Sequence, residues 1–342
     1  MTPKFIYTSD GRRIEAAHIN GYLMDAPDAW IESRTKPLCD VPEMRSGGKP
    51  VEGGHLILTT EEKDALLKIE PKAAMFIRPF MGSEDYIYNE ARWCLWLKDS
   101  SPAELRAMPH VMERVQKVRD FRLASVKAAT RQAADTPWRF MEIKQPTDGN
   151  FILVPKVSSE TRHYVPMGFM SFETIISDLA FLIPSATLYH FGVLTSSVHM
   201  AWMRAVAGRL KSDYRYSAAI VYNNFPWPRV ENVANVKMLP MTNTNSQLGN
   251  GNIGTGNNST MATLIAAAAQ AILDARAKYP DSSLADLYDP LTMPPDLRAA
   301  HTANDRAVLA AYGLAADTPE PEIVAHLFKL YAELANRGKE AQ

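Results

Sequence analysis

An asparagine-rich tract divides this chain of 342 residues. Residues 231–260 are rich in Asn, Thr, Ser and Gly, with NTNSQLGNGNIGTGNNST at their centre, and they offer little apolar surface. A segment of this composition cannot bury enough apolar surface to offset the entropy lost on ordering. We therefore expect a disordered linker over residues 231–260, and a folded domain on either side of it.

The residues after the tract predict a small all-α helical domain over 261–342. Residues 261–277 form an Ala-rich run without Gly or Pro, and residues 297–312 and 319–337 have the spacing of amphipathic helices. In the last of these, four apolar residues fall on one helical face: Ile323, Leu327, Leu330 and Leu334. Such a stripe is typical of a helix that packs one side against a core.

The residues before the tract predict an α+β domain over 53–230. Strand-like runs such as HLILTT (55–60) and NFILVPKV (150–157) are grouped together, with helical segments between the groups. This segregation favours an α+β arrangement over alternating βαβ units. Residues 1–52 have little periodicity and several turn signals, among them Pro27, Pro37 and Pro42. We interpret these residues as an extended lead-in.

Several broad classes can be set aside. No apolar run reaches membrane-spanning length, and the N-terminus lacks the apolar segment of a signal peptide. Cys39 and Cys94 are too few for a disulfide framework or a cysteine zinc site, and the eight histidines form no H-E-x-x-H motif. We expect a protein of the reducing cytoplasm, without a membrane partner and without a metal site.

The net charge of −1 hides an uneven distribution. Residues 101–230 carry 16 basic and 10 acidic side chains, whereas residues 1–100 and 261–342 have net charges of −3 and −4. A localised basic excess is what binding to a phosphate backbone requires. An excess of this size is also compatible with an ordinary solvated surface, so charge alone leaves both interpretations open.

Within the basic part, residues 109–134 predict one long helix, because no Gly or Pro interrupts the segment after Pro109. Apolar residues recur at helical spacing: Val111, Val115, Val118 and Leu123. The remaining faces are rich in cations and present either a solvated charged surface or a surface that lies along a phosphate backbone. On the second interpretation, three of these cations are candidate DNA contacts: Arg119, Arg122 and Lys127.

The segment AIVYNNFPWP (219–228) is similar to the Asn-Pro-Pro-aromatic tetrad of enzymes that methylate the amino groups of flipped DNA bases. The order of residues differs, because Phe225 follows Asn224 and Trp227 separates the two prolines. The chain also contains no G-x-G-x-x-G turn for a cofactor. We therefore interpret the segment as a strand end with packed aromatic side chains, and we predict no catalytic residue.

Eight other strings carry a more specific signal. They are ESRTKPLCDVPEM (32–44), FIRPFMGSEDYI (76–87), RWCLWLKDSSPAELR (92–106), ERVQKVRDFRLASVKAATR (113–131), VSSETRHYVPMGF (157–169), ATLYHFGVLTSSVHMAWMRAVAGRLKSDYRYS (186–217), IVYNNFPWP (220–228) and SLADLYDPLTMPPDL (283–297). In this order and spacing, the chain resembles the C-terminal part of MmeI-type (type IIL) restriction-modification enzymes and of related adenine-specific DNA methyltransferases. The resemblance covers nearly the whole chain except the Asn-rich tract.

The resemblance implies a DNA target-recognition domain over residues 53–230 and C-terminal helices over 261–342, with residues 1–52 joining to a methyltransferase domain. The catalytic tetrad and the S-adenosylmethionine pocket would belong to that upstream domain, so we expect no cofactor on this chain. The intact enzyme would use S-adenosylmethionine, and Mg²⁺ for any restriction activity. The chain would be part of an adenine-specific DNA methyltransferase rather than an enzyme by itself.

Two polar stretches offer the side chains that a DNA-reading surface needs, with cations for phosphates and polar groups for base edges. The first stretch contributes Lys156, Glu160, Arg162 and His163. The second contributes Arg204, Arg209, Lys211, Asp213 and Arg215. The alternatives are an ordinary polar turn for the first and surface ion pairs for the second. The strongest candidates are Arg162, Arg209, Lys211 and Arg215.

The function that these features predict is a sequence-specific recognition module. It would bind double-stranded DNA and position the target adenine for a methyltransferase catalytic domain, which is either fused to this chain or separate from it. One alternative is a free-standing DNA-binding or interaction protein that docks on a separate methyltransferase subunit. Another is the product of a decayed gene.

Overall fold

The computed structural model describes residues 3–7, 11–26, 28, 30–230 and 260–340. All of the predicted linker except Thr260 lies outside the described residues. Strands and helices are mixed up to residue 230, and only helices follow from residue 261 onwards. The predicted fold class, an α+β part followed by an all-α part, is confirmed. None of the helices in the described ranges combines the length and the apolar character needed to cross a bilayer.

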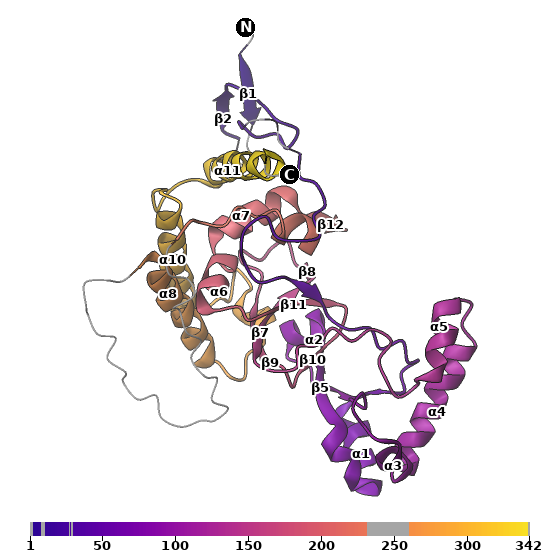
Figure 1. Ribbon diagram of the computed structural model, residues 1–342. Helices are drawn as coiled ribbons and strands as arrows, with labels where there is room; N and C mark the ends of the chain where they lie inside the picture. The colour runs from indigo at the N-terminus through magenta and orange to yellow at the C-terminus, as the bar shows by residue number, and fades with distance from the viewer. Residues whose placement is uncertain (1–2, 8–10, 27, 29, 231–259, 341–342) are drawn as a thin grey trace.

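The smaller lobe lies at the lower right of Figure 1 and contains a four-stranded sheet in the order β10-β5-β6-β4. Its strands are β4 (Ile57–Leu58), β5 (Ile77–Met81), β6 (Arg92–Leu95) and β10 (Ile175–Ile176). Its helices and 3₁₀ turns are α1 (Thr60–Ile69), η1 (Pro71–Phe76), α3 (Pro102–Arg106), α4 (Pro109–Leu123), α5 (Ala128–Gln132) and η2 (Ala133–Asp135). Val111, Val115 and Val118 of α4 belong to the same apolar cluster as Leu58 and Leu95 of the sheet.

The larger lobe is built around a second sheet, β3-β11-β7-β9, which is antiparallel throughout, and a third sheet, β12-β13-β8. The strands are β3 (Arg45–Ser46), β7 (Asn150–Pro155), β8 (Val157–Ser158), β9 (Gly168–Ser171), β11 (Ala180–Pro184), β12 (Gly208–Leu210) and β13 (Asp213–Arg215). The helical elements are α2 (Ser83–Tyr88), α6 (Leu188–Leu194), α7 (Ser197–Val206), a π-helical turn η3 (Ala218–Tyr222), α8 (Met261–Ala277), α9 (Leu284–Leu287), α10 (Pro295–Ala311) and α11 (Glu320–Glu340).

The C-terminal helices share one apolar core with α6 and α7. Trp202 of α7 is 0% exposed, and its ring lies 5.4 Å from that of Phe328 on α11. Gly192 of α6 faces α8 so closely that a Cβ there would lie 2.7 Å from Ile265 Cγ2. Helices α8 and α11 therefore pack directly on α6 and α7 in the larger lobe (Figure 1). The division of the chain at residues 52, 230 and 260 stays a prediction, but residue 260 does not separate two hydrophobic cores.

The N-terminal residues form a hairpin and then a strap. The hairpin consists of β1 (Lys4–Tyr7) and β2 (Arg13–Ala16), at the top of Figure 1. Residues 30–42, which we call the strap, then cross the larger lobe. The Arg34 N–H donates to Ala219 O at 3.0 Å, and the Trp30 carbonyl accepts from the Tyr331 hydroxyl at 3.0 Å. The strap therefore bonds to both η3 and α11.

The predicted single helix over residues 109–134 is wrong in its length, because α4 ends at Leu123 and α5 begins at Ala128. The Ser125 hydroxyl accepts a hydrogen bond from the Lys127 N–H at 3.2 Å. A serine side chain that binds a nearby backbone N–H competes with the helical hydrogen bonds and favours a turn. The break is reinforced by Arg131, whose guanidinium donates to the Ser125 and Val126 carbonyls.

Arg122 requires a correction, because it was predicted as a DNA contact and is 0% exposed. Its guanidinium donates to five backbone carbonyls, those of Pro50, Val51, Ala133, Thr136 and Arg139, at 2.7–3.0 Å. A guanidinium with its donors satisfied inside the lobe cannot contact a phosphate in this conformation. The side chain instead ties α4 to the loops before α1 and after α5.

Three histidines are buried in the larger lobe. His190 and His199 lie on α6 and α7, and His301 lies on α10. Burial lowers the pKa of His190 to about 4 and that of His199 to about 3, and it holds the pKa of His301 well below its usual value. His199 Nε2 lies 2.9 Å from the Tyr216 hydroxyl, and His301 Nε2 lies 2.8 Å from that of Tyr288.

These histidines predict acid destabilisation that begins near pH 6.5. In the unfolded chain they bind protons near pH 6.5, but in the folded protein they do not, so the unfolded state gains protons as pH falls. The free energy of unfolding should be highest above pH 6.5 and should decrease by about 1 kcal/mol per buried histidine at pH 5.5. Urea denaturation at a series of pH values measures this slope. His199→Gln should reduce it, the exposed His163→Gln should not, and an equal slope in both variants would contradict the assignment.

Arg122→Met should lower the free energy of unfolding by about 3 kcal/mol, because several buried carbonyls lose their donor. The matched control is Arg119→Met on the same helix, where the side chain is exposed and the change should be within about 0.5 kcal/mol. Urea denaturation followed by tryptophan fluorescence gives both values. Equal stability of the two variants would show that the carbonyl contacts of Arg122 contribute little.

Candidate nucleic-acid interface

The third sheet brings the two predicted polar stretches together. In the register of β8 and β13, Ser158 lies opposite Tyr214 and Val157 lies opposite Arg215. β12 and β13 form an antiparallel hairpin, residues 208–215, which we call the basic hairpin. Lys211 occupies its turn with a left-handed φ of +56°. Residues 159–164, which follow β8 and which we call the polar loop, therefore lie beside the basic hairpin.

Three cations of the basic hairpin are exposed: Arg209, Lys211 and Arg215. The Arg209 guanidinium lies 3.8 Å from the centre of the Tyr214 ring and donates to Ser212 O at 2.9 Å. These contacts orient Arg209 while leaving it open to solvent, and the Glu160 carboxylate lies 3.8 Å away. Lys211 and Arg215 form no ion pair with another residue in the described part of the chain.

Strand alternation separates the outward residues of β13 from the inward ones. Arg215 is exposed, whereas Tyr214 and Tyr216 on either side of it are buried. Burial raises the pKa of Tyr216 well above its usual value, and its hydroxyl lies 2.9 Å from His199 Nε2 in the core. Tyr214 and Tyr216 therefore anchor the hairpin, and the cations form its outer face.

The polar loop contacts the basic hairpin through its backbone. The Glu160 N–H donates to Asp213 Oδ1 of the hairpin at 3.4 Å. Within the loop itself, the Arg162 N–H donates to Ser159 O at 3.3 Å. The Arg162 side chain is half-buried, and those of Glu160 and His163 are exposed. Asp213 therefore supports the loop, and the Glu160 side chain lies beside Arg209 of the hairpin.

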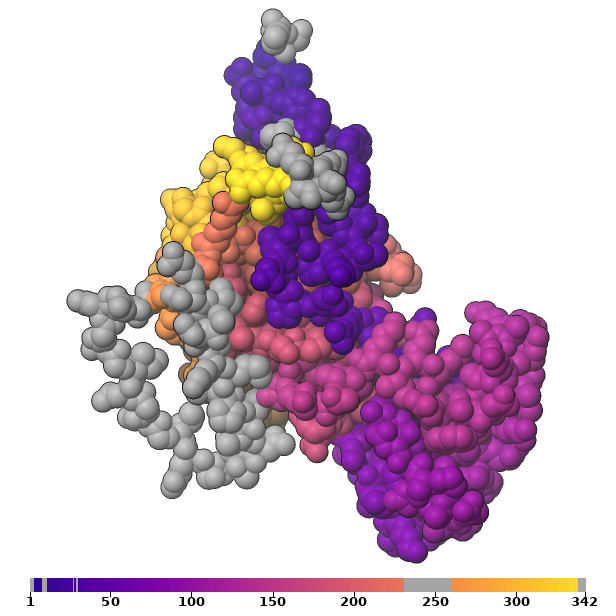
Figure 2. Space-filling view, viewed as in Figure 1, coloured from indigo at the N-terminus to yellow at the C-terminus, as the bar shows by residue number. Residues whose placement is uncertain are grey.

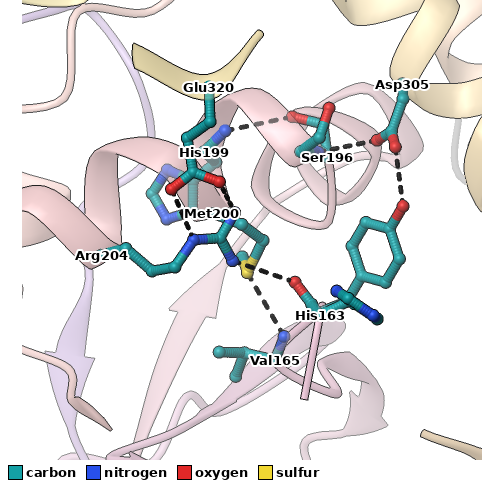
Figure 3. Close-up of polar contacts among 10 residues, drawn as sticks. His163, Val165, Ser196, His199, Met200, Arg204, Asp305 and Glu320 are labelled. Carbon is teal, nitrogen blue, oxygen red and sulfur yellow. Dashed lines mark hydrogen bonds and ion pairs between the residues drawn. The ribbon is translucent and has the colours of Figure 1, made fainter. Parts of the chain in front are cut away.

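Lys156 and Arg204 are placed differently from the other candidates. Lys156 Nζ donates to Ser46 Oγ at 2.8 Å and lies 4.5 Å from the centre of the Phe181 ring, so its charge is used within the lobe. Burial lowers the pKa of Lys156. Arg204 is 24% exposed and forms a bidentate ion pair with Glu320, with N···O distances of 2.8 and 2.7 Å. Figure 3 shows the Glu320 carboxylate opposite the Arg204 guanidinium.

Arg119 and Lys127 are exposed on the smaller lobe, on α4 and immediately before α5. Figure 2 shows an open hollow on the right-hand side, between the projecting basic hairpin and the lobe that carries α4 and α5. The predicted cations that are exposed thus belong to both lobes, Arg119 and Lys127 to the smaller one and Arg209, Lys211 and Arg215 to the larger one. The exceptions are Arg122, Lys156 and Arg204, which make internal contacts.

Two acidic residues that bind the polar candidates were not predicted from the sequence. Glu320 pairs with Arg204, and Asp305 accepts a hydrogen bond from the Tyr164 hydroxyl at the end of the polar loop. Glu320 begins α11 and Asp305 lies on α10, far along the chain from the residues that they contact. Their neighbours in sequence are ordinary helical residues, so no local pattern distinguishes them. Arg122, in contrast, could have been recognised as buried, because it continues the helical stripe of Val111, Val115 and Val118.

The NNFPWP segment is structural. Asn224 Oδ1 accepts from Arg34 Nε at 2.8 Å, and its Nδ2 donates to Glu32 O and Ala219 O at 2.8 and 2.9 Å. The Phe225 and Trp227 side chains are buried. The segment therefore holds the strap and has no free amide to bind a base. The predicted packing of its aromatics is confirmed.

The preceding apolar run is not a strand. Residues Ala218–Tyr222 form the π-helical turn η3, whose start is capped by the Ser217 hydroxyl. This corrects the sequence-based interpretation of a strand end. Among the described residues, no group of three or more His, Cys, Asp and Glu side chains is placed to hold a metal ion.

Comparison with known proteins identifies the families that this chain matches. The family described as MmeI, target recognition domain, matches residues 25–229, and the one described as MmeI, C-terminal domain, matches residues 258–337. DNA methyltransferase A of Bacillus subtilis (strain 168) is 35% identical over 335 residues, which are 98% of this chain and 35% of that protein.

A solved structure, that of the type IIL restriction-modification enzyme MmeI in complex with DNA, matches with a TM-score of 0.82 and 39% identity. The match covers 98% of this chain and 42% of MmeI, so the chain spans less than half the length of either relative. The resemblance seen in the sequence is confirmed. This chain belongs to the MmeI family, of which it carries the target recognition domain and the C-terminal domain.

Proposed function

We propose that this chain is the DNA target-recognition part of an adenine-specific DNA methyltransferase. The observation that carries the proposal is the basic hairpin, which presents Arg209, Lys211 and Arg215 to solvent beside the polar loop. The match to MmeI, solved in complex with DNA, supports a duplex as the ligand. A two-stranded ribbon of this kind fits the major groove of DNA, where base edges are distinguishable.

The side chains divide into two roles. Phosphate contacts would fall to Lys211 and Arg215 on the hairpin and to Arg119 and Lys127 on the smaller lobe, all of which are exposed. Phosphate contacts fix the position of a protein on the duplex but carry no sequence information.

The base-reading role would fall to side chains of the basic hairpin and the polar loop. Arg209 and Arg162 have the donor geometry for guanine, and Glu160 can accept from the amino group of cytosine. Arg209 is already held by Tyr214 and Ser212, so less side-chain entropy is lost when it binds. His163 is exposed on the same loop and adds a further polar group.

Methyl transfer would be performed by a catalytic domain outside this chain, either fused to it or separate. That domain would hold S-adenosylmethionine and receive the flipped adenine, and any restriction activity would require Mg²⁺. The role of this chain would be to bind and position duplex DNA in the cytoplasm. Asn224, the residue that most resembles a base-binding asparagine, is already fully bonded to backbone and to Arg34.

The test is the salt dependence of DNA binding. Arg209→Ala combined with Lys211→Ala should weaken binding to a mixed-sequence duplex and reduce the slope of log affinity against log salt by about 0.9 for each phosphate that the variant fails to neutralise. Fluorescence anisotropy between about 50 and about 200 mM salt measures this slope.

The matched control removes two exposed cations from the C-terminal helices, Lys278→Ala with Arg298→Ala, and so causes the same change in net charge. The control should retain the slope of the unmodified chain. An equal decrease of slope in both double variants would mean that net charge, and not the basic hairpin, accounts for binding.

A further inference from the structure

The polar loop is held from two sides. On one side it bonds to the basic hairpin, through the Glu160 N–H and Asp213. On the other side it contacts the C-terminal helices, although these lie far along the chain. DNA contacts by the hairpin and the loop do not by themselves require these contacts with the C-terminal helices.

The first contact to the helices runs through Arg204. Its Nη1 donates to the His163 carbonyl of the polar loop at 3.3 Å, while Nε and Nη2 donate to the two oxygens of Glu320 on α11. Figure 3 shows Arg204 between these two partners. A bidentate guanidinium–carboxylate pair fixes the plane of the guanidinium. Glu320 therefore determines where Arg204 holds the loop backbone.

The second contact runs through Tyr164 at the end of the loop. Its hydroxyl donates to Asp305 Oδ2 on α10 at 2.7 Å, and its ring stacks on that of His301, with centroids 4.1 Å apart and planes at 21°. The other Asp305 oxygen accepts from the Ser197 N–H, at the start of α7, at 2.7 Å. Asp305 therefore joins α10, α7 and the loop at one half-buried point.

These contacts leave little freedom for the residues between them. Asp305 is half-buried, and its two oxygens accept hydrogen bonds from Tyr164 and Ser197, so loss of either donor would cost free energy. Arg162 and His163 lie between the Asp213 contact and the Tyr164 contact. Their positions relative to the basic hairpin are set by both.

We propose that Glu320, Asp305 and Tyr164 are positioning residues for DNA recognition: through Arg204 and the end of the polar loop, the C-terminal helices fix the loop that carries Arg162 and His163. The helices thereby contribute to sequence preference without touching the DNA. This role rests on the proposed function. Arg204 acts as the link, since its charge is paired and its donors are directed at Glu320 and at the loop.

The experiment compares Glu320→Gln and Tyr164→Phe with the unmodified 342-residue chain. The first variant removes the charge of the bidentate pair, and the second removes one hydroxyl while retaining the ring stack. The matched control is Asp296→Asn, which breaks the Lys278–Asp296 pair of the same helical region, away from the loop. The probe is a pool of duplexes with a randomised core, enriched by binding and sequenced, followed by the affinities for the enriched and a scrambled duplex.

Both variants should reduce the ratio of the two affinities by about 5-fold or more, the effect expected when one base contact is misplaced. Their salt slope and their affinity for the scrambled duplex should not change, because phosphate contacts are retained. Amide hydrogen exchange should become faster in residues 159–165, and Asp296→Asn should match the unmodified chain throughout. A destabilised protein alone would not lower the ratio at constant non-specific affinity.

Two outcomes would overturn the positioning role. One is an unmodified chain that prefers a sequence, together with a Glu320→Gln variant that keeps the full ratio and the slow exchange. The other is a reduced salt slope in Glu320→Gln, which would mean that this region meets the phosphates directly. A failure of the unmodified chain to enrich any sequence would reject the proposed function itself. Because Glu320 is partly exposed, its variant carries the test even where Tyr164→Phe is unstable.

Discussion

The larger lobe depends on the packing of α6 and α7 between the sheets and the C-terminal helices. Gly192 allows α6 and α8 to approach to a distance that excludes a Cβ, and Asn304 of α10 donates to the Gly192 carbonyl at 2.8 Å. Trp202 lies at the centre, bonded through Nε1 to Val221 O. Burial of side chains of this size stabilises a fold by about 1.5–3 kcal/mol each. The recognition part and the C-terminal helices are therefore one structural unit, although a long tract separates them in sequence.

This packing reaches the candidate interface through Tyr216. One side of the third sheet is fixed in the core by Tyr214, Tyr216 and His199, and the other side presents cations to solvent. A surface held in this way needs little rearrangement when it meets a duplex. The buried contacts of Tyr214 and Tyr216 thus account for the positions of the exposed hairpin cations, which themselves have few partners among the described residues.

Much of this architecture follows from local rules. The helical stripes of the C-terminal part and the exposed cations of the basic hairpin could be predicted, because each depends on neighbours in sequence. The errors arose where distant segments decide. The helical stripe indicates that Arg122 is buried, but its carbonyl acceptors lie in segments on either side of α4 in the sequence, and NNFPWP binds the distant strap. Glu320 acquires its role only when α11 reaches α7, and no spacing in the sequence encodes that approach.

The contacts of Trp202 also set an order of events during synthesis. Its partner Phe328 is translated on the order of 10 s later, at typical rates of chain elongation. Over that interval the apolar faces of α6 and α7 have no helices to cover them, and the strap has no Tyr331 to hold Trp30. The nascent chain must carry an exposed apolar surface until α11 emerges. A ribosome stalled within α10 would therefore carry an aggregation-prone, protease-sensitive chain, even though every residue of the candidate interface had already been synthesised.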